Sequence, residues 1–212
     1  MRLVRNSLSL SPLFSPHSIA SRLTSLPPTT IPHTVDEQDL TDTYLPPFQS
    51  GVQRGNASGL MCSYNSVNGV PSCGNKAYLN GKIRKEWGFD GYVTSDCGAV
   101  SDVQNNHHYT KTGDNTSFVV LDAGMDSDCG GFLNSNLGKA ISDGAVTKST
   151  WGPALTNLFR VRMRLGQFDP IAQQPYLAYG LDKINSAPHQ ALAYEAARQG
   201  LVLLKNTAKT LP

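Results

Sequence analysis

The sequence contains no apolar run that approaches the ~20 residues of a membrane-spanning helix. It also contains no run rich in lysine and arginine, and its formal net charge is only +2. The first absence argues against a membrane partner, and the second argues against a nucleic-acid partner. A neutral partner is expected instead. With 212 residues, 39% of them hydrophobic, the chain is long enough for one large domain or two small ones with a real core.

The signature motifs of several enzyme classes are also missing. There is no GxSxG nucleophile elbow, no P-loop and no GxGxxG dinucleotide motif. His107 and His108 are adjacent in sequence, so they do not share a helix face as the histidines of an HExxH zinc site do. These absences argue against a serine hydrolase of that type, a nucleotide-binding enzyme and a zinc protease. No cofactor or metal is expected.

The four cysteines, Cys62, Cys73, Cys97 and Cys129, form no CxxC pair, which argues against a zinc ribbon. Two alternatives remain open from composition: two disulfides in an oxidising compartment, or four buried thiols. The sequons at Asn56 to Ser58 and Asn115 to Ser117 slightly favour a secreted protein.

Residues 1–35 contain no aspartate or glutamate, and they are rich in serine and proline. They lack the continuous apolar stretch of a secretory signal. Their serine and arginine content is typical of a transit peptide, but the prolines argue against an amphipathic helix. We interpret residues 1–35 as a poorly ordered leader and base no function on it.

Beyond the leader, the pattern predicts alternating strands and helices. Thr34 and Glu37 have the spacing of a helix-capping box, and Pro46-Pro47 should break or kink the helix that follows. Strands are expected over 58–65, 88–95 and 123–130, with a last apolar strand over 201–206. Helices are expected over 76–88, from about residue 115, over 149–166 with Pro153 in its first turn, and over 189–200.

Such alternation predicts parallel strands joined by helical crossovers, which is an α/β fold. In these folds the ligand site lies beyond the carboxyl ends of the strands. Three strand ends carry chemically useful residues: Met61 to Asn65, Asp96-Cys97, and Asp126 to Cys129. We expect these ends to converge on one pocket. For Asp96, the alternative is an ordinary helix N-cap at a strand-to-helix turn.

Five segments in order resemble family 3 glycoside hydrolases: "MCSYNSVNG", "EWGFDGYVTSDCGAVSDV", "AGMDSDCGGF", "RMRLGQFD" and "AARQGLVLLKN". The similarity is greatest to the β-xylosidase branch of fungi and plants. It implies that residues 36–168 are the C-terminal part of a (β/α)₈ TIM barrel, with its last strands and helices. It also implies an interdomain linker over 169–186 and the first helix and strand of an α/β sandwich domain over 187–212.

The resemblance also implies roles for individual residues. Asp96 matches the nucleophile, Tyr64 the tyrosine that hydrogen-bonds it, and Met61 a residue lining the sugar pocket. Cys97 occupies a position where the family's β-glucosidases usually carry tryptophan. The resemblance pairs Cys97 with Cys129, and Cys62 with Cys73. A disulfide beside the nucleophile would exclude the hydroxymethyl group of glucose, whereas a simple packing role for Cys97 remains the alternative.

The implied activity is retaining hydrolysis that releases xylose from the non-reducing end of xylo-oligosaccharides through a covalent glycosyl-Asp96 intermediate. Retention needs two carboxyl groups ~5–5.5 Å apart. The family's acid/base belongs to a stretch beyond Pro212, so this chain alone should be nearly inactive. The alternatives are a β-glucosidase, an α-arabinofuranosidase or a non-catalytic remnant. The resemblance implies an extracellular location.

The remaining polar residues of these loops are expected to have structural roles. Asp90 should cap the turn before the strand, and Asp102 should cap the helix after the nucleophile loop. Asp126 and Asp128 should make structural hydrogen bonds. His107 and His108 are expected to be solvated loop residues, with a sugar contact as the alternative.

Overall fold

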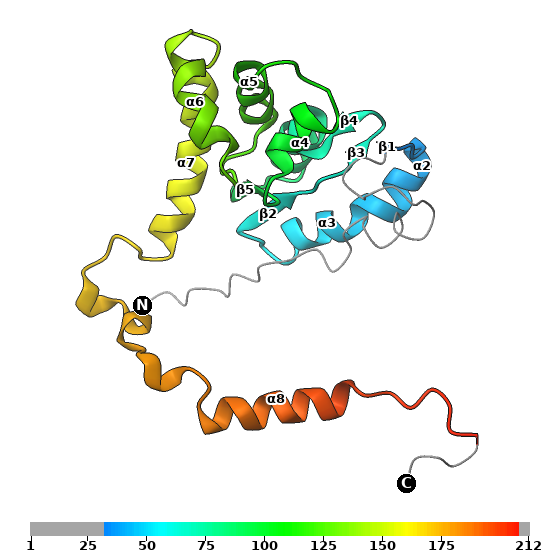
Figure 1. The fold of residues 1–212 in the computed structure, drawn as a ribbon, viewed down its shortest axis with the longest axis vertical. Coiled ribbons are helices and arrows are strands. Elements are labelled where there is room, and N and C mark those ends of the chain that lie inside the picture. Colours follow the sequence, from blue (N-terminus) through cyan, green and yellow to red (C-terminus); the bar gives the residue numbers. More distant parts are fainter. Residues whose placement is uncertain (1–31, 208–212) are drawn as a thin grey trace. The chain divides into compact units, whose positions relative to one another are not determined.

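A computed structural model describes residues 32–207 (Figure 1). The chain divides into two compact units, the first ending at Leu165 and the second beginning at Gly166. Most of the predicted leader therefore lies outside the described residues. None of the helices in the described part is long and apolar enough to cross a membrane.

The first unit is built on a parallel pair of strands, β2 (Gly59–Cys62) and β5 (Tyr92–Ser95). Their register places Cys62 beside Ser95, so both strands end at the same level. A parallel bridge between Thr94 and Ser127 adds the third segment. A smaller sheet has the order β1 (Pro32–His33), β3 (Ser66–Val67), β4 (Val70–Pro71).

The strand expected over 123–130 is therefore reduced to one bridge. The backbone N–H groups of Asp126 and Ser127 both donate to the Val93 carbonyl oxygen, at 2.8 and 3.1 Å. Two consecutive residues on one acceptor interrupt the regular ladder of a parallel pair. The segment nevertheless runs beside β5, as the α/β prediction requires.

The first helical region starts at Asp36 rather than at the predicted Thr34 cap. The Asp36 carboxylate accepts the backbone N–H of Asp39 at 2.7 Å, and α2 (Glu37–Asp39) follows. A π-helical turn (Leu40–Tyr44) leads into α3 (Leu45–Gln53). Pro46 and Pro47 lie in the first turn of α3, directly after the π-helical turn, where the helix changes its hydrogen-bond pattern. The regular helix is thus interrupted at the predicted position, and a kink there stays a prediction.

The other helices of this unit are a π-helical segment (Ala77–Glu86), α4 (Ala99–Asn105), α5 (Gly113–Ala123), α6 (Phe132–Ser142) and α7 (Lys148–Arg164). The sequence pattern did not predict α6. The helix predicted over 149–166 is present as α7, but it begins at Lys148 after Thr147, so Pro153 lies inside the helix and not in its first turn. Figure 1 shows α3 on one side of the β2–β5 pair and α4 on the other.

Apolar side chains from the strands and from the helices on both sides of the β2–β5 pair form one core. Val93 of β5, Val100 and Val103 of α4, Val120 of α5 and the nearby Met125 are completely buried. Burying side chains of this size contributes about 1.5–3 kcal/mol each. Because β5 joins this core through Val93, the end of the strand is fixed in position.

The second unit consists of three short 3₁₀ turns (Ile171–Gln173, Pro175–Ala178, Leu181–Lys183) and α8 (Ala187–Gly200). The helix predicted over 189–200 is present. The strand predicted over 201–206 is wrong for this structure, because these residues pair with no strand within the described chain. An apolar strand needs a neighbouring edge to satisfy its backbone groups, and Leu201 to Leu204 are exposed instead.

Candidate active site

The three predicted chain ends meet at the carboxyl end of the β2–β5 pair. The Asp96 backbone N–H donates to the Cys62 carbonyl oxygen at 2.9 Å. The Ser95 N–H donates to Ser127 at 2.9 Å, and the Gly98 N–H donates to Cys129 at 2.8 Å. These bonds bring the three chain ends together, as predicted, and the shared pocket stays a prediction.

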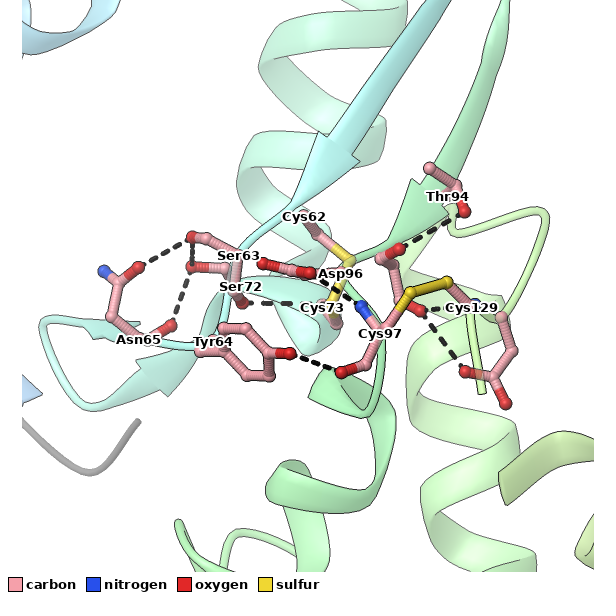
Figure 2. Close-up of a disulfide and its surroundings, with 12 residues drawn as sticks. Cys62, Ser63, Tyr64, Asn65, Ser72, Cys73, Thr94, Asp96, Cys97 and Cys129 are labelled. Atoms are coloured by element: carbon pink, nitrogen blue, oxygen red, sulfur yellow. Dashed lines mark hydrogen bonds between the residues drawn. A yellow bond between two sulfur atoms is a disulfide. The ribbon is translucent and has the colours of Figure 1, made fainter. Parts of the chain in front are cut away.

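Asp96 is the first residue beyond β5, and its side chain is half-buried. Burial alternates along the strand, with Val93 and Ser95 inside and Thr94 and Asp96 less covered. This alternation turns Asp96 away from the core side of the strand. Its Oδ1 accepts the Cys97 backbone N–H at 2.7 Å (Figure 2).

The alternative role of Asp96, a helix N-cap, does not fit this hydrogen bond. Gly98 is the N-cap residue of α4 and makes no side-chain capping bond. An N-capping carboxylate accepts an N–H two or three positions into the helix, whereas Asp96 accepts the N–H of the next residue, before the helix begins. The carboxylate is held by the loop and is not consumed in capping.

Tyr64 extends from the loop after β2 toward the same place. Its hydroxyl donates to the Cys97 carbonyl oxygen (Figure 2). Partial burial raises the pKa of the Tyr64 hydroxyl, and the charges of Asp96 and Asp102 and a hydrogen bond with Asp96 raise it further. A phenol with a raised pKa stays protonated. Tyr64 is therefore a permanent hydrogen-bond donor beside Asp96.

Met61 lies in β2, opposite Thr94 of β5, and it is 37% exposed. The next residue, Cys62, is buried on the other face of the strand. Met61 thus presents an apolar side chain to solvent one residue before the strand ends. Such a surface suits contact with the apolar face of a ligand.

All four cysteines are paired, as Cys62–Cys73 and Cys97–Cys129, with Cα–Cα distances of 5.1 and 4.3 Å. These are the pairs that the family resemblance implies, and the buried-thiol alternative does not hold. One disulfide ties the end of β2 to the 3₁₀ turn Ser72–Gly74, and the other joins the residue after Asp96 to the neighbouring chain end. Figure 2 shows Asp96 and Tyr64 close to both disulfides.

Two neighbouring carboxylates have structural roles. Asp126 is almost completely buried, where it pairs with the Arg84 guanidinium and accepts the Val93 N–H at 2.7 Å. Asp128 accepts the Leu133 N–H at 3.0 Å at the start of α6. Both residues thus make the structural hydrogen bonds predicted from the sequence.

The capping roles predicted for Asp90 and Asp102 are wrong. Asp90 forms an exposed ion pair with Arg164 of α7, at 2.6 Å. The Arg164 hydrogen bond lowers the pKa of the Asp90 carboxyl. Asp102 lies inside α4 and is buried, because Gly98 occupies the N-cap position. The α4 helix starts earlier than a cap at Asp102 requires.

The two adjacent histidines differ in their environments. His107 is half-buried, and its Nε2 lies 2.7 Å from the Tyr64 carbonyl oxygen. His108 is exposed, with a backbone φ of +50°. The prediction of a solvated residue therefore holds for His108 but is wrong for His107. Because the partner of His107 is a backbone atom, no side-chain motif marks the contact.

Ser95 connects the end of β5 to the chain segment at Asp128 and Cys129, and it was not identified from the sequence. Its buried hydroxyl donates to the Asp128 carboxylate at 3.2 Å and accepts the Cys129 N–H at 2.8 Å. The sequence signal that could have identified it is its place at the last position of β5, directly before Asp96.

The described chain offers no metal site, and a cavity beside α5 and α7 involves none of the predicted site residues. Within residues 32–207, no group of three or more histidine, cysteine, aspartate or glutamate residues is arranged to hold a metal ion. A cavity of about 310 Å³ lies between the Ala77–Glu86 segment, α5 and α7. Its walls include Arg84, Asp126 and Asn157, and none of the predicted site residues.

Comparison with known families gives a match over residues 25–156 to the Glycosyl hydrolase family 3 N terminal domain. A relative from Medicago sativa subsp. varia, named beta-xylosidase/alpha-L-arabinofuranosidase 1, is 44% identical over 179 residues, which are 84% of this chain and 23% of the relative. Probable beta-D-xylosidase 7 of Arabidopsis thaliana is 46% identical over 82% of this chain and 23% of the relative.

Solved structures give the same picture. A GH3 exo-beta-xylosidase (XlnD), in complex with a xylobiose aziridine activity-based probe, has a TM-score of 0.76 and 36% identity, over 86% of this chain and 24% of that one. A beta-glucosidase from Listeria innocua in complex with glucose has a TM-score of 0.71 and 26% identity, over 85% of this chain and 24% of that one. The chain spans less than a quarter of the length of these relatives.

Proposed function

Since the chain belongs to glycosyl hydrolase family 3, we propose that it carries the nucleophile side of the active site of a retaining β-xylosidase. Asp96 is the proposed nucleophile. The observation that carries this proposal is its half-buried carboxylate at the end of β5, held by the Cys97 N–H and next to the Tyr64 hydroxyl. The substrate class is β-linked xylo-oligosaccharides.

In the proposed first step, an Asp96 oxygen attacks the anomeric carbon, and the bond to the leaving oxygen breaks as that oxygen receives a proton. In the second step, water gives up a proton and displaces the sugar from Asp96, which is the retaining mechanism. We assign the proton transfers to no residue of this chain. Asp126 and Asp128 are engaged in structural hydrogen bonds, which fits an acid/base contributed from elsewhere in a longer protein.

Three other residues complete the proposed site. Tyr64, as a protonated phenol shared between the Cys97 carbonyl oxygen and the Asp96 carboxylate, orients the attacking oxygen. Met61 offers an exposed apolar side chain for the sugar. The Cys97–Cys129 disulfide starts at the residue next to Asp96, and we propose that its bulk narrows the space for the hydroxymethyl group of glucose and so favours a pentose. A steric effect of this kind is worth a few kcal/mol, compared with ~1–3 kcal/mol for one added apolar contact.

The proposed architecture is the last part of a (β/α)₈ barrel over residues 36–168, a linker over 169–186 and the start of an α/β sandwich domain over 187–212. The parallel β2–β5 pair flanked by helices supports the barrel assignment. An extracellular location is proposed as well. Two disulfides support it, because disulfides persist in oxidising compartments.

Two alternative substrate classes remain, arabinosides and glucosides, and the names of similar proteins favour them. The Medicago relative is named as both a xylosidase and an arabinofuranosidase, and the Listeria neighbour is a glucosidase in complex with glucose. A non-catalytic remnant is the third alternative. These possibilities differ in which sugar, if any, reacts with Asp96.

Mechanism-based labels separate them without requiring an acid/base. A 2,4-dinitrophenyl 2-deoxy-2-fluoro glycoside carries a leaving group that departs without protonation, and the fluorine slows hydrolysis of the sugar–Asp96 ester. We expect the β-xyloside to label the chain at least about tenfold faster than the β-glucoside. A faster glucoside or arabinoside would replace the xylosidase assignment, and no labelling by any of them would support the remnant.

Turnover of ordinary substrates tests the role of the missing acid/base. A positioned acid/base typically contributes ~10²–10⁴-fold, so the chain alone should hydrolyse nitrophenyl β-xyloside very slowly. Turnover comparable to that of a complete family member would contradict this part of the proposal.

A further inference from the structure

The contact between His107 and Tyr64 connects two loops that are far apart in sequence. His107 Nε2 lies 2.7 Å from the Tyr64 carbonyl oxygen. A carbonyl oxygen only accepts hydrogen bonds, so Nε2 must carry the proton. The His107 backbone N–H also donates to the Asp102 carbonyl oxygen at 2.8 Å. The backbone of His107 is thus anchored to the end of α4, while its imidazole holds the backbone of Tyr64.

Asp102 lies one turn before His107, and its carboxylate is incompletely satisfied. One oxygen accepts the Asn106 side-chain amide at 2.5 Å. The other, Oδ2, is buried and has no hydrogen-bond partner among the described residues. A buried polar atom without a partner costs about 1–3 kcal/mol. An aliphatic side chain would avoid this cost, so the carboxylate invites a functional explanation.

The charge of Asp102 reaches both His107 and Tyr64. Burial raises the pKa of the Asp102 carboxyl, whereas the Asn106 hydrogen bond and the charge of His107 lower it. The Asp102 charge also contributes to the raised pKa of Tyr64. The groups that act on one another here are therefore Asp96, Tyr64, Asp102 and His107, contributed by β5, the loop after β2, and α4 with its C-terminal loop.

We propose that His107 and Asp102 are positioning residues that hold Tyr64 in place against Asp96. His107 fixes the Tyr64 backbone through its Nε2–H, and the charge of Asp102 acts on both His107 and Tyr64. With its backbone fixed, Tyr64 keeps its hydroxyl at Cys97 and Asp96. The inference deepens the proposed function and rests on it for its catalytic meaning.

The structure offers a closely matched set of variants. His107→Ala removes the donor, and His107→Gln returns an N–H at a similar distance from the backbone. His108→Ala is the control, because it removes an exposed imidazole one residue away. The readout is the rate at which the full chain is labelled on Asp96 by 2,4-dinitrophenyl 2-deoxy-2-fluoro-β-xyloside.

We expect His107→Ala to slow labelling about tenfold. His107→Gln should recover most of the rate, and His108→Ala should match the unmodified chain. Asp102→Asn should label more slowly while resisting urea better, because the buried charge is gone. A purely structural role for Asp102 predicts the opposite change in stability. Equal labelling rates for His107→Ala and His108→Ala would overturn the inference.

Amide hydrogen exchange separates failure of this inference from failure of the proposed function. His107→Ala should accelerate exchange in the peptide that contains Ser63 to Asn65, whereas His108→Ala should not. If the unmodified chain takes no label, the nucleophile assignment fails, and the exchange data alone decide the positioning role. Unchanged exchange in His107→Ala would overturn that role.

Discussion

At the scale of single residues, the site depends on the hydrogen bonds that hold Asp96 and Tyr64 in place. The Asp96 carboxylate accepts the backbone N–H of Cys97. The residue before it, Ser95, is held by hydrogen bonds to Asp128 and Cys129. Tyr64 is fixed from two sides, by Cys97 at its hydroxyl and by His107 at its carbonyl oxygen. All of these contacts except the bond between Ser95 and Asp128 have a backbone atom as one partner.

The first prediction at the scale of residues concerns the Tyr64 hydroxyl. Tyr64→Phe removes the donor beside Asp96, and a hydrogen bond to a charged group is worth about 1.5–3 kcal/mol. We expect labelling of Asp96 to slow by roughly tenfold or more. The control is Tyr109→Phe, because Tyr109 is 46% exposed. Equal rates for the two variants would show that the Tyr64 hydroxyl does not assist Asp96.

Asp102 gives a prediction about pH. Burial raises its folded pKa above the unfolded value of ~3.9. The folded chain then binds more protons than the unfolded chain between these two values, so this group makes stability fall as pH rises through that window. Asp102→Asn should be more stable than the unmodified chain at neutral pH, by about 1 kcal/mol.

That advantage should disappear as the pH is lowered below the unfolded pKa, because the carboxyl is then protonated in both states. Urea unfolding at a series of pH values, with the unmodified chain alongside, measures the difference. A stability difference that does not change with pH would contradict the assigned cause.

At the scale of elements, the loop between β5 and α4 depends on a left-handed residue. Gly98 has a φ of +94° and is the N-cap residue of α4. This conformation costs a residue with a Cβ about 1–2 kcal/mol. The loop joins Asp96 and Cys97 to the helix, so strain at this position is transmitted directly to the site.

Gly98→Ala should therefore lower the free energy of unfolding by about 1–2 kcal/mol and slow labelling of Asp96. Gly131→Ala is a matched control: Gly131 is the N-cap of α6 with a φ of −107°, and an added Cβ meets nothing within 4 Å at either glycine. Urea unfolding of both variants measures the difference. Equal costs would place the cause in capping rather than in backbone strain.

The elements also show which features a sequence predicts. The strand at β5 was predicted because Tyr92, Val93 and Thr94 are strand formers between glycines. The α6 helix was missed because Asn134, Asn136 and Gly138 are poor helix formers. The helix forms through packing against α5 and through the Asp128 bond to its first turn, and neither contact is visible in a local pattern.

In the site, too, local sequence patterns predicted some features, whereas features that depend on tertiary contacts were missed. The convergence of the chain ends was predictable from alternation and from the C-terminal rule for parallel strands. The family motifs supplied the cysteine pairs. The roles of Asp90, Asp102 and His107 were not predictable, because each depends on where α4 or α7 begins or ends. A shift of one helical turn exchanges a cap for a buried interior residue.

At the scale of the whole molecule, the two disulfides join segments that hydrogen bonds alone connect weakly. The described strands are short, and the sheet that carries the site has one parallel pair and one bridge. Cys97–Cys129 closes a loop with a sequence separation of 32, and Cys62–Cys73 closes one of 11. Loop closure restricts the unfolded chain more for the longer loop.

Replacing Cys97 and Cys129 by serine should lower the free energy of unfolding by about 3–4 kcal/mol. The same replacement of Cys62 and Cys73 should cost about 3 kcal/mol. Urea unfolding without reductant compares the two double variants with the unmodified chain. An equal or smaller loss for the Cys97 and Cys129 pair would contradict the entropic account of the longer loop.

The central claim is that Asp96 forms the covalent bond to the sugar. The most direct measurement is peptide mass spectrometry of the full chain after reaction with 2,4-dinitrophenyl 2-deoxy-2-fluoro-β-xyloside, with Asp96→Asn treated in parallel. We predict one fluoroxylosyl group on the peptide that contains Asp96 and none on the variant. A label on another carboxylate, equal labelling of Asp96→Asn, or no label on a chain with both disulfides formed would contradict the account.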